Sequence, residues 1–203
     1  MSKFQLIILN STAMQNFLRS YQLLSEAEIE SLGPYLRFRR LEKGDYLIKA
    51  GRICTEIAFV QSGLLRSYFT SDDGEEITYC FTFENTLMTA YSSLITGLPS
   101  PENIQALMPT ELWVLQKRDL GTLAHQSINW VLLQKHLAEQ QYVELEKRIF
   151  SYQKEKASER YQDLLLAQPH YLQQIPLQYL ASYLGITRRH LSRIRREILE
   201  NAN

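Results

Sequence analysis

Residues 176–198, PLQYLASYLGITRRHLSRIRREI, determine the architecture of the C-terminal part of this chain. Pro176 can begin a helix, because the N–H that it lacks would stay unpaired in a first turn anyway. Gly185 tolerates the left-handed backbone of a sharp turn, and Thr187 can cap a second helix. The expected buried residues are Leu177, Leu180, Ala181 and Leu184 in the first helix, with Leu191, Ile194 and Ile198 in the second. This pattern predicts a helix-turn-helix, whose second helix enters the major groove of DNA.

The second helix also concentrates positive charge in a chain that is neutral overall, with 22 basic and 22 acidic side chains. The arginine side chain can contact phosphates and can also form bidentate hydrogen bonds with guanine edges. A charge run alone is equally consistent with a solvated helix face, but the turn glycine and the apolar spacing favour DNA binding. The first turn should reach bases and nearby phosphates, and Arg195 and Arg196 should meet the backbone. The predicted DNA-binding residues are Thr187, Arg188, Arg189, Ser192, Arg193, Arg195 and Arg196.

Composition limits the remaining classes of protein. With 45% apolar residues among 203, the chain can bury a core, which argues against intrinsic disorder. No stretch approaches the ~20 apolar residues of a membrane span. The apolar run Phe4–Leu9 is short, with no small-residue cleavage site, which argues against a signal peptide. These features predict a cytoplasmic protein with no membrane partner.

Residues 11–36 indicate short helices, with Ser25 and Glu28 as a capping box and Gly33-Pro34 as a stop. From Phe38 to about Leu115, short runs rich in β-branched and aromatic residues alternate with turns that contain glycine. Strands of this length and spacing predict a small β-barrel or sandwich. The clearest strands are expected at 46–48, 56–60, 64–69 and 77–81.

Residues 126–159 instead carry a helical period. A helix of ~30 residues spans ~45 Å, which exceeds the width of a small barrel. Trp130, Leu133 and Leu137 can pack on the barrel of the same chain, but the far end of the helix needs another partner. A second copy of the chain is the simplest one, which predicts a homodimer. The predicted dimer residues are Ala138, Tyr142, Leu145, Ile149 and Tyr152.

Taken together, these segments resemble the Crp/Fnr family of transcription regulators over essentially the whole chain. The resemblance rests on Lys43-Gly44-Asp45, Ala50-Gly51, residues 60–66, Gly74-Glu75-Glu76-Ile77 and residues 180–187, in that order. It implies an α+β fold in which a double-stranded β-roll of the cyclic nucleotide-binding type precedes a long dimerisation helix and a small helix-turn-helix domain. The expected boundaries are 1–118 for the roll with its N-terminal helices, 119–158 for the dimerisation helix and 159–203 for the DNA-binding domain.

The resemblance also implies partners: double-stranded DNA with a palindromic operator, a second copy of the chain, and RNA polymerase as a further candidate. Members that bind cyclic AMP use a Gly-Glu-aliphatic triplet for the ribose and an arginine for the phosphate. Here those positions fall on Met88-Thr89-Ala90 and on or beside Ser100, and no basic residue lies between Arg66 and Lys117. Because a buried phosphate needs a cation, cyclic AMP is disfavoured.

The other cofactors of the family are disfavoured as well. Two cysteines, Cys54 and Cys80, cannot supply an iron–sulfur cluster, and with so few ligands no metal site is expected. All four histidines lie at or beyond residue 125, outside the strand region, which disfavours haem and also the metal set of a cupin-like enzyme. No catalytic constellation is visible, so the chain is predicted not to be an enzyme.

The segment at 90–100 takes the place of the nucleotide cassette. It is either a neutral, hydroxyl-lined pocket for a small effector other than cyclic AMP, or a short helix and turn that only closes the roll. The candidate effector residues are Arg66, Thr89, Tyr91, Ser92, Ser93, Thr96 and Ser100. The predicted function is sequence-specific transcription regulation. The alternative is a ligand-binding sensor that acts through protein partners without binding DNA.

Overall fold

The computed structural model describes residues 12–201, so the apolar run Phe4–Leu9 lies outside the described residues. The chain divides into two compact units. The first comprises the residues up to Ser67 with Phe81–Gln140, and the second comprises Tyr68–Cys80 with the residues from Gln141 onward. None of the described helices is both long enough and apolar enough to cross a membrane.

The first unit begins with the expected short helices, α2 (Thr12–Ser20) and α3 (Glu26–Ser31). The capping box is confirmed: the Ser25 hydroxyl accepts from the Glu28 N–H, and the Glu28 carboxylate accepts from the Ser25 N–H. Gly33-Pro34 ends the helix, as expected, but it does so by starting the 3-10 helix η1 (Gly33–Tyr35).

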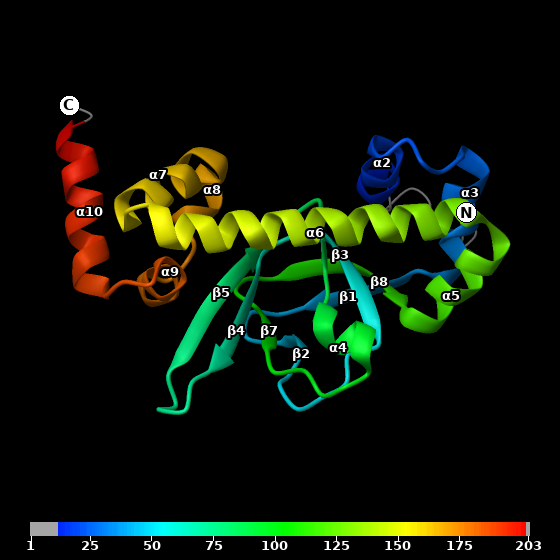
Figure 1. Cartoon of the computed structure of the whole chain (residues 1–203), viewed down its shortest axis with the longest axis horizontal. Coiled ribbons are helices and arrows are strands. Elements are labelled where there is room, and N and C mark those ends of the chain that lie inside the picture. Colours follow the sequence, from blue (N-terminus) through cyan, green and yellow to red (C-terminus); the bar gives the residue numbers. More distant parts are fainter. Residues whose placement is uncertain (1–11, 202–203) are drawn as a thin grey trace. The chain divides into compact units, whose positions relative to one another are not determined.

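Short strands build the roll (Figure 1). They form two four-stranded sheets, in the orders β1-β8-β3-β6 and β2-β7-β4-β5. The four strands predicted from composition correspond to β2, β3, β4 and β5, within two residues at each end. The bounds are β1 Arg37–Leu41, β2 Tyr46–Ile48, β3 Glu56–Ser62, β4 Leu65–Thr70, β5 Glu76–Thr82, β6 Thr86–Met88, β7 Asn103–Ala106 and β8 Thr110–Gln116.

The turn between β3 and β4 requires a glycine. Gly63 has a φ of +101°, and a Cβ placed there would lie 2.5 Å from the Thr110 Oγ1 and 2.7 Å from the Thr110 Cα. Neither the backbone angle nor the space admits another residue. The Gly63 backbone therefore packs directly on the start of β8, the strand that pairs with β3.

Alternation along the strands separates two apolar cores in the first unit. Ala58, Val60 and Val114 point to one side of the sheet and join a cluster with residues of β4 and β7. Phe59 and Trp113, their neighbours in sequence, point to the other side and pack against the N-terminal helices and the start of the long helix. The cassette position is occupied by the short helix α4 (Tyr91–Thr96).

The long helix is shorter than predicted at both ends. The segment 119–158 contains all but the first two residues of α5 (Lys117–Gln126), all of α6 (Ile128–Lys154) and the start of α7 (Ala157–Ala167). Ser127 separates α5 from α6, because its backbone is extended rather than helical. Its hydroxyl accepts a hydrogen bond from the Asn129 N–H and thereby caps α6. Residues 155 and 156 form the second junction. The sequence analysis missed these breaks because neither junction contains a glycine or a proline.

Glu28 ties α3 to the α5–α6 junction. Its carboxylate accepts from the Ser127 hydroxyl and from the Asn129 amide, the latter at 3.1 and 3.2 Å. The hydrogen bonds from Ser127, then from Ser25, lower the pKa of Glu28 from 4.5 to about 2. A carboxyl whose pKa is lower in the folded state stabilises the fold above its unfolded pKa, and this contribution is lost as the pH falls from about 4.5 toward about 2.

We therefore expect Glu28→Gln to lower the free energy of unfolding at pH 7 by about 1–2 kcal/mol, and the deficit to shrink below pH 4. Urea titrations followed by the fluorescence of Trp113 and Trp130, both buried in the adjacent core, measure this at both pH values. Glu30→Gln, two residues along the same helix and exposed, is the matched control. A Glu28→Gln deficit that is the same at pH 7 and pH 3 would contradict the assignment.

The second unit holds the C-terminal part of α6 together with α7, α8 (Pro169–Leu172), α9 (Leu177–Leu184) and α10 (Arg188–Asn201). It also includes the outer part of the β4–β5 hairpin, residues 68–80. The Ser182 hydroxyl of α9 accepts from the Thr78 N–H at 2.9 Å and donates to the Glu76 carbonyl at 3.3 Å. One helix of the predicted DNA-binding pair thus hydrogen-bonds to the edge of β5.

Candidate nucleic-acid interface and sensor site

The two predicted C-terminal helices are present and meet at Gly185. This residue ends α9 in the left-handed conformation, with φ 69° and ψ 31°, and the Ile186 N–H then reaches back to the Ala181 carbonyl at 3.0 Å. Leu180, Ala181 and Leu184 of α9 are buried, as are Leu191 and Ile194 of α10. Figure 1 shows α10 turned steeply away from α9.

All five arginines of α10 are exposed, together with Thr187 and Ser192. Arg189, Arg193 and Arg196 are spaced four and three residues apart, so they lie on one face, opposite Leu191 and Ile194. Arg188 and Arg195, seven apart, lie along the flank of that face. The fold therefore presents a strip of guanidinium groups to solvent, with the apolar stripe of the same helix as its support.

Local bonds already engage part of this strip. The Thr187 hydroxyl accepts from the His190 N–H at 3.2 Å, which caps α10 as predicted. The Ser192 hydroxyl donates to the Arg188 carbonyl at 3.0 Å, and Arg193 lies 3.6 Å from Glu197. Arg189 and Arg196 have no carboxylate within ion-pair distance among the described residues. The same holds for Arg188 and Arg195, so four of the five arginines are open to a phosphate or a base.

The predicted dimer residues occupy an exposed apolar strip of α6. Tyr142, Leu145 and Ile149 are 66%, 58% and 50% exposed in the single chain. Ala138, one turn earlier, is half-buried. Tyr152 departs from the expectation: its hydroxyl donates to the Tyr183 carbonyl of α9, and its ring packs near Gly185. The strip without Tyr152 still presents large apolar side chains to water, and the dimer interface stays a prediction.

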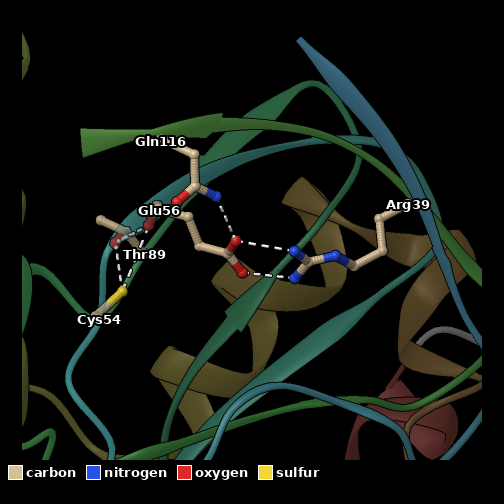
Figure 2. A network of polar contacts seen from close by, with 5 residues as sticks. All are labelled: Arg39, Cys54, Glu56, Thr89 and Gln116. Atoms are coloured by element: carbon tan, nitrogen blue, oxygen red, sulfur yellow. Dashed lines mark hydrogen bonds and ion pairs between the residues drawn. The ribbon is translucent and has the colours of Figure 1, made fainter. Parts of the chain in front are cut away.

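In the roll, a polar network surrounds Glu56 (Figure 2). The Arg39 guanidinium donates two hydrogen bonds to the Glu56 carboxylate, at 2.5 and 2.8 Å. The Gln116 side-chain amide donates a third to the same carboxylate at 3.0 Å. On the backbone side, the Thr89 hydroxyl donates to the Glu56 carbonyl at 2.8 Å and lies 3.2 Å from the Cys54 sulfur. Sequence reasoning missed Arg39, Glu56 and Gln116, because the network joins three strands that are far apart along the chain.

The seven candidate effector residues are not gathered around one space. Tyr91, Ser92 and Thr96 are exposed on α4, whereas Arg66, Ser93 and Ser100 are buried. Most of the hydroxyls serve the backbone: Thr96 donates to the Ser92 carbonyl, and Ser100 to the Glu102 carbonyl at 3.0 Å. Ser93 donates to the Leu98 carbonyl at 2.5 Å and accepts from the Cys54 N–H at 2.9 Å. Of the two interpretations of this segment, these contacts favour the helix and turn that closes the roll.

Neither Cys54, which is buried, nor Cys80, which is half-buried, forms a disulfide. Within the described residues, no group of three or more histidine, cysteine, aspartate or glutamate side chains is placed to hold a metal ion. A groove of about 850 Å³ runs along the C-terminal half of α6 in the second unit, with Arg148, Arg160 and Tyr183 in its wall. Burial raises the pKa of the Tyr183 phenol.

Comparison with known protein families identifies a domain in the roll. Residues 38–127 match the cyclic nucleotide-binding domain, and this match covers β1 to α5. No curated protein matches the chain in sequence.

Solved structures show the likeness of the whole fold. A transcriptional regulator of the Crp/Fnr family from Eubacterium rectale is 21% identical, with a TM-score of 0.70 over 92% of this chain and 88% of that one. FixK2 from Bradyrhizobium japonicum is 15% identical, with a TM-score of 0.72 over 82% and 86%. The catabolite activator protein of Thermus thermophilus is 23% identical, with a TM-score of 0.53 over 88% and 85%. The chain therefore has the fold of Crp/Fnr-type regulators.

Proposed function

We propose that this chain is a sequence-specific, DNA-binding transcription regulator of the Crp/Fnr type that works as a homodimer. The observation that carries the proposal is α10, in which exposed arginines stand opposite a buried apolar stripe, directly after a left-handed glycine turn. This geometry supports a helix inserted in the major groove, where its first turn reaches base edges.

The charge distribution supports DNA rather than a protein as the partner. The chain as a whole is neutral, yet residues 188–196 hold five arginines and no acidic residue. Such a concentrated positive strip attracts a polyanion without coating the remaining surface. The likeness to a Crp/Fnr regulator over 92% of the chain supports the same partner.

Dimerisation is supported by the strip of α6 that contains Tyr142, Leu145 and Ile149. A monomer would leave these side chains in water, whereas two copies of the strip would cover one another. A symmetric dimer carries two copies of α10, so its operator should be an imperfect palindrome with half-sites ~34 Å apart on one face of the duplex.

Sequence-specific binding is the direct test of the proposal. Selection from random duplexes should enrich a palindrome, and fluorescence anisotropy should show binding at least ~10³-fold tighter than to a scrambled duplex at physiological salt. Binding of equal strength to both duplexes, or none to either, would instead favour a sensor that acts through protein partners.

The roll is proposed to have lost the cyclic AMP site. Met88 and Ala90, at two positions of the ribose triplet, are buried in the apolar core, and the hydroxyl of Ser100, where the phosphate-binding arginine would lie, is engaged by its own turn. If the roll senses an effector, that effector should be a small molecule other than cyclic AMP.

We expect cyclic AMP to give no saturable heat in titration calorimetry at micromolar concentrations and to leave DNA binding unchanged. A phosphate enclosed without a cation would forfeit its strongest interaction. The same protein preparation must also bind the selected operator, which shows that it is folded. An absence of heat on adding cyclic AMP then cannot be attributed to unfolded protein. Saturable micromolar binding would overturn this expectation and would require a phosphate ligand such as Arg66.

A further inference from the structure

We propose that Arg160 is a positioning residue that fixes the angle between the DNA-reading helices and the dimer helix, and thereby the operator spacing that the dimer accepts. This inference rests on the proposed function. It adds a residue that lies outside the DNA-facing strip and outside the dimer strip. All contacts that carry it lie within the second unit.

Arg160 lies in the first turn of α7 and folds back over the two-residue junction that follows α6. Its Nη1 donates to the Glu155 carbonyl at 2.6 Å, directly beyond the end of α6. Its Nη2 donates to the Leu184 carbonyl at 2.9 Å, the last carbonyl of α9 before Gly185. One planar group therefore joins the C-terminal end of α6 to the C-terminal end of α9.

Electrostatics explains why the group is an arginine. The C-terminal carbonyls of a helix are unpaired and carry partial negative charge, so a cation between two such ends is favourable to both. A cation in the first turn of α7 is disfavoured by the dipole of α7 itself. Arg160 therefore gains its favourable interactions from α6 and α9. Its rigid fork reaches two carbonyls at once, which a lysine ammonium cannot do in the same geometry.

Aromatic contacts stabilise the same joint, the place where the C-terminal ends of α6 and α9 meet Arg160 of α7. The Arg160 guanidinium stacks on the Tyr152 ring at 4.7 Å, and Arg148 lies over the Tyr183 ring at 4.5 Å. Tyr152 also donates from its hydroxyl to the Tyr183 carbonyl. The Tyr152 ring lies 3.5 Å from where a Cβ of Gly185 would be. The turn at Gly185, which sets the direction of α10, thus contacts α6 directly through Tyr152 and is linked to the end of α6 by Arg160.

A fixed joint has a measurable consequence in a dimer. Two rigidly held copies of α10 can engage both half-sites only at one spacing, because an added base pair moves a half-site by ~3.4 Å and turns it by about a tenth of a turn. Loss of simultaneous engagement removes an avidity gain that reaches about 10²–10⁴. Loosening the joint should lower affinity at the best spacing and should also weaken the penalty for other spacings.

The experiment uses the full chain and duplexes that carry the selected half-sites at the best spacing, at one base pair more or less, and as a single half-site. Wild type should lose about tenfold or more in affinity when the spacing changes. Arg160→Ala should bind the best spacing about tenfold more weakly and should discriminate spacings only about twofold, while its affinity for the single half-site stays within about twofold of wild type. Arg160→Lys should resemble Arg160→Ala, and Lys147→Ala, an exposed cation on α6, should resemble wild type.

Tyr152→Phe keeps the ring but removes the bond to Tyr183, and it provides a second, milder variant that should relax spacing discrimination in the same direction. Wild-type discrimination retained by both Arg160→Ala and Tyr152→Phe would overturn the inference. So would an equal loss of affinity by Arg160→Ala on the single half-site and the full operator, or full rescue by Arg160→Lys. Failure of wild type to prefer any sequence would overturn the proposed function instead.

Discussion

Replacing Arg189 by alanine is expected to cost about 1–3 kcal/mol for each base contact that it removes and to relax the sequence preference at one position in each half-site. Arg189 lies in the first turn of α10, at the centre of the face opposite Leu191 and Ile194, where a side chain reaches furthest into the groove. Because the substitution acts in both halves of a symmetric dimer, the affinity for the full operator should fall by about one to four orders of magnitude.

Arg196→Ala is the matched control, since it removes the same charge from the same face two turns later. There the side chain should meet a phosphate, so the loss of affinity should be similar for all sequences, and the slope of affinity against salt should flatten by about one unit per phosphate. Repeated selection with both variants measures base preference, and salt titrations measure phosphate contacts. If Arg196→Ala changes the preferred bases while Arg189→Ala leaves them intact, α10 lies in the groove in the opposite orientation.

The second large effect is expected at the dimer strip. Leu145→Asp or Ile149→Asp would place an unpaired carboxylate between two copies of α6, at a cost of several kcal/mol. Light scattering should then change from a dimer at micromolar concentration to a monomer of 23.7 kDa. DNA affinity should fall with it, because only a dimer engages both half-sites at once.

Val143→Asp is the control for this effect. Val143 is 44% exposed on the same helix, but the helical spacing directs it well away from Leu145 and Ile149. It should leave the dimer intact. A wild-type chain that scatters as a monomer throughout the micromolar range would contradict dimerisation itself, and dissociation by Val143→Asp alone would move the interface to another face of α6.

Local signals in the sequence were sufficient for much of the fold. The left-handed Gly185, the Thr187 cap and the Ser25–Glu28 capping box were all predicted, because each depends on residues only a few positions apart. The central strands were predicted for the same reason, since β-branched and aromatic runs between glycine turns determine them locally.

Features that depend on distant partners could not be predicted. Ser127 breaks the long helix and binds Glu28, 99 positions away, while Arg160 and Tyr152 reach α9 across 24 and 31 positions. The hydroxyl-rich segment at 90–100 had the composition of a pocket, yet Ser93 and Ser100 direct their hydroxyls to nearby backbone carbonyls. Composition reveals which groups can form hydrogen bonds, and only the fold reveals which of them are already engaged.

Footprinting on the selected operator tests most directly whether α10 reads DNA as part of a symmetric dimer. Methylation protection, which reports on guanine N7 in the major groove, should show two protected clusters, one in each half-site, centred ~34 Å apart on one face of the duplex. With Arg189→Ala, protection should weaken at a single position in each half-site. A single protected cluster, protection confined to the minor groove, or a pattern unchanged by Arg189→Ala would contradict major-groove reading by a symmetric pair of α10 helices.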